Sequence, residues 1–142
     1  MRQAKSMAEL EKLIMDDMEK AMNIVFEKSK KTAKDEVQAF YSKGSPTIYK
    51  RTGKLGKSSR SYGVNRYGNS VDFYVWLDRT YDYTVPNPAF TDRGFASYFS
   101  TPMVFDAAEA GVANIKGRSG FWERTEQQIE SDLDSTFARF FN

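Results

Sequence analysis

Carboxylate pairs are the main candidates for catalytic chemistry in this sequence, because it contains no cysteine and no histidine. The absence of both excludes disulfides, thiolate chemistry and every mechanism that needs a histidine base. A metal-dependent hydrolase could still use clustered carboxylates, and the two candidate pairs are Asp16 with Asp17 and Asp132 with Asp134. Adjacent helical residues point about 100° apart, and the second pair diverges further. We therefore expect no enzyme activity, no metal site and no cofactor.

The tripeptide Gly56-Lys57-Ser58 matches the end of a P-loop, the glycine-rich loop that binds nucleotide phosphates. The first glycine of that motif should lie five residues before Gly56, but Arg51 occupies this position. The sequence around the tripeptide also lacks the order of strand, loop and helix that a P-loop requires. We interpret the match as coincidence.

A basic segment without any acidic residue extends from Val37 to Val71. Its basic residues are Lys43, Lys50, Arg51, Lys54, Lys57, Arg60 and Arg66. Basic side chains interleaved with tyrosines can bind a nucleic-acid backbone. The formal net charge of the chain is only +2, however. A solvated loop, or a surface that pairs with an acidic protein, is therefore the favoured interpretation, and nucleic-acid contact is the alternative.

The C-terminal part of the chain is rich in carboxylates. They are Glu123, Glu126, Glu130, Asp132 and Asp134. One interpretation is an ordinary solvated helix face. The other is that this face pairs with the basic segment of a second copy, because head-to-tail contacts of that kind close into rings.

The elements that position these residues begin with one long helix. Ser6 and Glu9 fit a capping box, and apolar residues then recur every three or four positions up to Tyr41. A helix over residues 7–42 would be about 54 Å long, which is long for a domain of this size. We therefore expect part of it to contact a neighbour, and a kink or an exposed stretch over the polar residues 28–36.

A loop and a hairpin should follow the long helix. Glycine and proline residues make 43–57 a loop. Ser58–Tyr67 and Val71–Asp78 have the composition of two strands, with a hairpin turn at residues 68–70 between them. Both faces of the second strand are rich in apolar residues, so both faces could be covered.

The remainder of the chain reads as a third strand, a loop and two helices. Thr80–Val85 could form the strand, and residues 86–100 form a long aromatic loop of the kind that is usually functional or mobile. Thr101 and Pro102 predict the start of a short helix, and Gly111 predicts its end. Residues 121–141 have a second amphipathic pattern, which should pack against the first helix.

These elements predict an α+β fold in a single domain, residues 1–142. A long N-terminal helix would pack on a small antiparallel β-sheet, with a short helix and a C-terminal amphipathic helix beside it. The hydrophobic fraction of 40% is sufficient for a core. The N-terminus does not resemble a secretory signal, and no apolar run is long enough to span a membrane. We expect the chain in the cytoplasm or in a soluble assembly, with no membrane partner.

Two short motifs carry a resemblance to a known family. The first is Arg51-Thr52-Gly53 followed by Leu55 and Ser58, and the second comprises Pro102, Phe105, Ala107, Ala108 and Glu109. Together with the order of the elements, they resemble the tail-completion or head–tail joining family of long-tailed bacteriophages, often labelled minor tail component. In that family an R-T-G-x-L-x-x-S junction leads the long helix into the sheet. The chain departs from the family pattern at residues 81–85, which lack a glutamate and a Gly-Thr pair, and in its longer tail from Gly117.

The resemblance implies a structural protein without catalysis, which forms a homo-oligomeric ring, expected as a hexamer, at the phage neck or the top of the tail. Its partners would be head-closure or connector proteins, tail proteins and the passing genomic DNA. It would reside in the virion, and in the host cytoplasm during assembly. Residues expected at subunit or partner contacts are Arg51, Thr52, Lys54, Leu55, Lys57, Phe95, Phe99 and Trp122. Residues expected along a DNA channel are Lys43, Lys50, Arg60 and Arg66.

Two points stay open at this stage. Trp76 and Trp122 are candidate contact anchors, but large aromatic residues are usually buried, so the core is the favoured place for both. The alternative function is a small nucleic-acid-binding or regulatory protein that uses the basic segment 43–66, with binding that weakens as salt rises.

Overall fold

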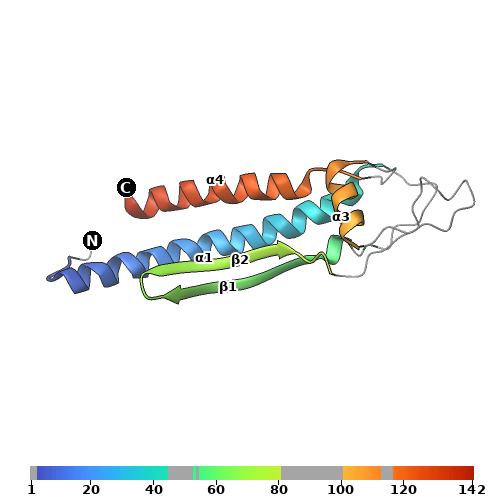
Figure 1. The fold of residues 1–142 in the computed structure, drawn as a ribbon. Coiled ribbons are helices and arrows are strands. Elements are labelled where there is room, and N and C mark those ends of the chain that lie inside the picture. The colour runs from blue at the N-terminus through green and yellow to red at the C-terminus, as the bar shows by residue number, and fades with distance from the viewer. Residues whose placement is uncertain (1–2, 45–52, 54, 81–100, 113–116) are drawn as a thin grey trace, which may run out of the picture.

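The computed structural model describes residues 3–44, 53, 55–80, 101–112 and 117–142. Three α-helices, two short 3-10 helices (Phe40–Ser42 and Leu55–Lys57) and one hairpin make up this part of the chain, which confirms the predicted α+β fold. The long helix α1 (Met7–Ala39) packs against both the C-terminal helix α4 (Phe121–Phe141) and the hairpin, and all of them run along one long axis (Figure 1). The short helix α3 (Thr101–Ala110) lies at the end of α1 away from the N-terminus.

Helix α1 begins at the predicted cap. The backbone N–H of Glu9 donates to Ser6 Oγ over 3.2 Å, and the Glu9 carboxylate accepts from the backbone N–H of Lys5 over 2.6 Å. The helix continues without interruption through residues 28–36, which are exposed apart from the buried Ser29 and Ala33 and the half-buried Thr32 and Glu36. Of the two expected alternatives for this stretch, exposure is therefore the one observed. A short 3-10 helix, Phe40–Ser42, ends the element.

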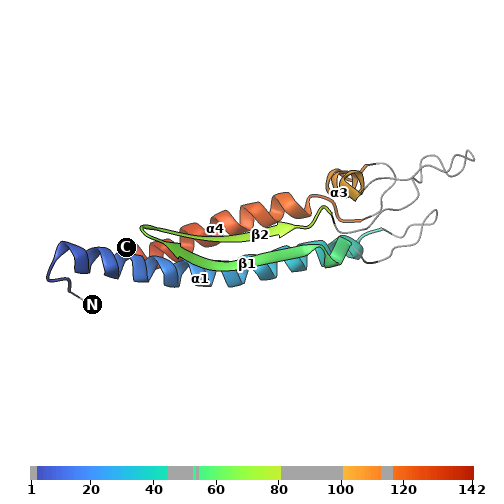
Figure 2. The same ribbon diagram turned by 60° about the horizontal axis from the view of Figure 1, so that its bottom comes forward.

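Strands β1 (Ser59–Tyr67) and β2 (Ser70–Leu77) form an antiparallel hairpin, as predicted. Their register pairs Ser59 with Leu77 and Tyr67 with Ser70, and it is irregular between Tyr62 and Asn65. One face of the hairpin packs on α1, where the ring of Phe73 lies 5.6 Å from that of Phe26. The opposite face is open, so the expectation that both faces are covered is wrong. Figure 2 shows this open face toward the viewer.

The turn after β2 is built by Asp78. Its Oδ1 accepts from the backbone N–H of Thr80 over 2.9 Å and from Thr80 Oγ1 over 2.6 Å, which is the turn chemistry expected of Asp. The rest of the expected third strand, Thr80–Val85, and the aromatic stretch 86–100 lie outside the described residues.

The two remaining helices begin and end as the sequence indicates. Gly111 follows α3 with a φ of 70°, the left-handed backbone that glycine adopts at the end of a helix. Helix α4 packs along α1 in the opposite direction (Figure 1). Its first residue, Phe121, is fully buried and meets the rings of Phe40 and Phe105 edge to face.

The main hydrophobic core lies where all of these elements meet, at the end of α1 that carries the 3-10 helix. Its members are Val37, Phe40, Leu55, Leu77, Phe105, Ala107, Ala108 and Phe121. At the other end, α1 extends past both the hairpin turn and the end of α4 (Figures 1 and 2). Met7, Leu10 and Ile14 are exposed there. None of the helices in the described residues is both long and apolar enough to cross a membrane.

Candidate functional site

The described part of the R-T-G-x-L-x-x-S motif is a structural junction. Leu55 is only 6% exposed and belongs to the core, and Ser58 Oγ donates to the carbonyl of Leu55 over 2.6 Å. Gly56 fits against the end of α1 and the 3-10 helix that follows it, because its N–H donates to Tyr41 Oη over 2.9 Å and its carbonyl accepts from Gln38 Nε2 over 2.6 Å. This part of the motif therefore fixes the entry of the chain into β1. The placement of Leu55 corrects its expected position at a contact surface.

A basic groove lies beside this junction, between α1 and the start of β1. Its volume is about 380 Å³, and its lining comprises Lys30, Lys34, Gln38, Gly56, Lys57, Ser59 and Ser61. The register explains the hollow. Ser59 and Ser61 pair with Leu77 and Val75 of β2, so β1 offers hydroxyls where β2 offers larger apolar side chains to α1. We call this hollow the basic groove.

The charge of the basic groove is only partly neutralised by the described residues. None of the described residues that line it is a carboxylate. Lys34 and Lys57 make no ion pair with another described residue, whereas Lys30 pairs with Glu27 over 2.9 Å and lies 5.2 Å above the ring of Phe26. A second hollow of about 630 Å³ adjoins it on α1, since Lys30 and Lys34 line both. A basic surface therefore extends along α1.

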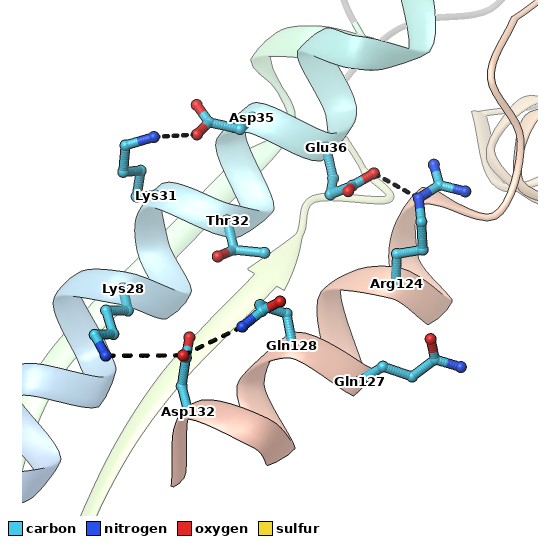
Figure 3. Close-up of a pocket in the computed structure, with 9 residues that line it drawn as sticks. All are labelled: Lys28, Lys31, Thr32, Asp35, Glu36, Arg124, Gln127, Gln128 and Asp132. Atoms are coloured by element: carbon cyan, nitrogen blue, oxygen red, sulfur yellow. Dashed lines mark hydrogen bonds and ion pairs between the residues drawn. The ribbon is translucent and has the colours of Figure 1, made fainter. Parts of the chain in front are cut away.

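A different groove, of about 600 Å³, lies between α1 and α4 (Figure 3). Its ion pairs join Glu36 to Arg124 over 2.9 Å and Lys28 to Asp132 over 3.8 Å. Lys31 also donates to Asp35 within this groove. Three cations thus meet three carboxylates. Because the charges of its lining cancel, this groove has no excess charge with which to attract an ionic ligand, and its contacts hold α4 on α1.

The solvent face of α4 carries an unpaired acidic stripe. Its members are Glu123, Glu126, Glu130 and Asp134, all of them exposed. Spacings of three and four residues place them along one side of the helix. No ion pair joins any of them to another described residue. The ion pairs between α4 and α1 are made by Arg124 and Asp132 instead. We call this set the acidic stripe.

The outer face of the hairpin is aromatic. Tyr62 and Tyr74 are direct cross-strand partners, each 57% exposed, and Trp76, which is 43% exposed, pairs with Arg60. Tyr67 lies further along the hairpin and is 60% exposed. Tyr, Trp and Arg are the residues most enriched in the energetic centres of protein interfaces. This placement of Trp76 corrects the expectation that it lies in the core.

The predicted contact residues differ in their exposure, and several of them lie outside the described part of the chain. Lys57 is exposed in the basic groove, while Trp122 is half-buried against the core. Arg51, Thr52, Lys54, Phe95 and Phe99 lie outside the described residues, as does Lys50 of the expected DNA channel.

Two of the three described residues expected along the DNA channel are held in ion pairs within the molecule. Arg66 contacts Asp16 over 2.9 Å and Glu19 over 3.6 Å on α1, and the hydrogen bond with Asp16 raises the pKa of the guanidinium. Arg60 donates to the carbonyls of Lys57 and Ser59 and pairs with Asp78 over 3.5 Å. Lys43 is exposed.

Three of the four carboxylates considered for catalysis are occupied in ion pairs, and the fourth, Asp134, belongs to the acidic stripe. Asp16 pairs with Arg66, Asp17 with Lys20 over 3.7 Å, and Asp132 with Lys28. Within the described residues, no group of three or more carboxylates is close enough to hold a metal ion.

The sequence alone did not single out Lys30, Lys34 or Tyr74 as site residues. The signal for the lysines was their spacing of four residues on α1, which places them on one face. Nothing in the sequence indicated that the neighbouring Lys28 and Lys31 would instead line the groove against α4.

Comparisons with known proteins give no independent assignment: neither a protein-family model, nor a curated protein, nor a solved structure matches this chain.

Proposed function

We propose that this chain is a structural virion-assembly protein, which forms a homo-oligomeric ring at the phage neck or the top of the tail and joins the head connector to the tail. The observation that carries the proposal is the outer face of the hairpin. Tyr62, Tyr74 and Trp76 stay exposed side by side in a single copy. Aromatic residues clustered on one surface are typical of contacts with another protein.

Two further features support an assembly role. The apolar face of α1 continues past the end of α4 at Leu10 and Ile14, where a single copy leaves it exposed. Lys34 and Lys57 of the basic groove and the four carboxylates of the acidic stripe have no ion-pair partner among the described residues. A chain with opposite charges on separate surfaces can associate head to tail, and such contacts close into rings. The proposed location at the phage neck or the top of the tail comes from the motifs that resemble the head–tail joining family.

Mass and shape in solution test the proposal. Light scattering and negative-stain imaging over a range of protein concentrations should detect closed rings. Replacing Trp76 and Tyr74 together by serine should weaken their formation, because the exposed aromatic surface is lost. Phe141→Ser is the matched control, since Phe141 is 45% exposed and lies outside the hairpin. Rings that form equally well in the Trp76 and Tyr74 variant would contradict the role of the hairpin face.

The second candidate function is nucleic-acid binding, and the basic groove favours it because three lysines line it without a carboxylate. Phosphate contacts make such binding strongly dependent on salt. A chain that stays monomeric and binds duplex DNA tightly at low salt would support this function and contradict the ring. Ring formation without DNA would count against it.

A further inference from the structure

We propose that the basic groove is the docking site for the acidic stripe of α4 from a second copy of this chain. This inference rests on the proposed ring and names the contact between its subunits. The aromatic face of the hairpin would supply much of the affinity of assembly, while the charged contact would set which surfaces meet and in which direction.

The groove has the chemistry to receive carboxylates. Lys30 and Lys34 stand one turn apart on its α1 wall, and Lys57 stands on the opposite wall. Ser59, Ser61 and the side-chain amide of Gln38 add uncharged polar groups to the lining. Lys34 and Lys57 have no ion-pair partner among the described residues, so a carboxylate of a partner would not have to displace one.

The acidic stripe matches this groove in charge and in form. It carries four exposed carboxylates, from Glu123 to Asp134, and extends over roughly 16 Å at 1.5 Å per residue. Because the ion pairs of α4 with α1 use Arg124 and Asp132, the stripe is left outside the intramolecular contact. A row of carboxylates along a rigid helix can meet lysines on both walls of the groove.

The two surfaces cannot satisfy each other within one copy. Helix α4 contacts α1 through Arg124 and Asp132, whereas the described lining of the groove comes from α1 and from the chain around the start of β1, with no residue of α4. The stripe of one copy is therefore available only to the groove of another. Each copy then offers one groove and one stripe, which is the heterologous arrangement that propagates around a ring.

Charge reversal on each side tests the contact. The groove variant carries Lys34→Glu with Lys57→Glu, and the stripe variant carries Glu126→Lys with Glu130→Lys. Each alone should weaken self-association by about tenfold or more, because attraction becomes repulsion at two positions. Combining all four substitutions in one chain should restore self-association, since the charges are then exchanged rather than lost. The matched control is Lys5→Glu with Lys12→Glu, two exposed lysines of the N-terminal end of the chain outside the groove.

Sedimentation or light scattering at salt concentrations from about 0.05 M to about 0.5 M measures the result, because added salt screens exposed charges. Rings that form equally well in the groove and stripe variants would overturn this contact and leave the ring proposal standing. Loss of assembly in both single-surface variants without recovery in the combined variant would also overturn it. A wild-type chain that stays monomeric up to about 1 mM at low salt would contradict it as well. In that case the ring proposal would depend on whether isolated head or tail structures bind the chain.

Discussion

Two grooves flank helix α1, and both are lined by its lysines. In the groove against α4, Lys28 and Lys31 meet carboxylates, and Glu36 meets Arg124, so charge is cancelled within the molecule (Figure 3). In the groove against β1, Lys34 and Lys57 have no such partner among the described residues. The first groove is part of the fold, and the second is a surface open to a partner.

Lysine content alone therefore does not locate a binding surface. Lys30, Lys31 and Lys34 lie within five positions of one another and line one shared hollow on α1, yet only Lys31 also lines the groove against α4, and only Lys30 and Lys34 line the basic groove. What separates them is the element opposite. Helix α4 brings Asp132 to Lys28, whereas β1 brings hydroxyls, and the 3-10 helix before it brings Lys57, to the groove that Lys34 lines.

The largest loss of stability should come from removing the buried aromatic contact that holds the start of α4 on α1. Phe121→Ala should lower the free energy of unfolding by about 3–5 kcal/mol, because Phe121 is fully buried between two other rings. Urea unfolding followed by circular dichroism measures the loss. The control Phe141→Ala, at an exposed ring stacked on Phe137, should cost less than about 1 kcal/mol. Equal losses in the two variants would show that Phe121 does not anchor α4.

A substitution at Gly56, which lines the basic groove, should have the next largest effect on stability. A Cβ at position 56 would lie 2.8 Å from Gln38 Nε2 and from a ring carbon of Tyr41. Gly56→Ala should therefore cost about 1–3 kcal/mol, since both side chains must move and the hydrogen bonds that they make with Gly56 are disturbed. Gly63→Ala is the matched control, because a Cβ there meets no atom within 4 Å. A thermal melt in which both variants behave alike would contradict the close packing at Gly56.

The ion pair between Glu36 and Arg124 should have a smaller effect. Glu36→Gln is expected to cost about 1 kcal/mol, because Arg124 keeps only its bond to the carbonyl of Ser119 and the pair is partly exposed. A double-mutant cycle with Arg124→Gln should give a coupling of roughly 0.5–1 kcal/mol. Glu126→Gln, on the unpaired stripe, serves as the control and should not change stability. A coupling of zero would mean that this groove is not held by its charges.

The smallest effect on stability should come from the basic groove lysines. Lys34→Gln is expected to change the free energy of unfolding by less than about 0.5 kcal/mol, because Lys34 is exposed and has no ion-pair partner among the described residues. Self-association should nevertheless fall in the same variant. Lys12→Gln, an exposed lysine outside the groove, should change neither quantity. A clear loss of stability in Lys34→Gln would place this lysine in the fold rather than at a contact.

Much of the fold follows from local signals in the sequence. The cap at Ser6, the left-handed backbone at Gly111 and the turn around Gly68 mark where elements begin and end. Each of these depends on residues within a few positions of one another, so a reading of the chain can identify it. The length of α1 and the packing of α4 against it follow from apolar spacing.

The candidate site was far less predictable. Both faces of β2 carry apolar residues, so alternation alone could not say that Phe73 would face α1 while Trp76 stayed exposed. Likewise, the basic segment contained Arg66, but its partners Asp16 and Glu19 lie about fifty positions earlier in the chain.

The helices, the hairpin and the absence of cysteine and histidine chemistry follow from the amino-acid sequence, because composition and local periodicity are properties of the chain alone. The pairing of charges depends on the tertiary structure. Lys28 meets Asp132 because α4 packs next to it, whereas the described lining of the groove at Lys34 comes from α1 and the chain around the start of β1 and contains no carboxylate. Ion pairing depends on distances of a few ångströms between side chains, and those distances exist only once distant elements have packed together.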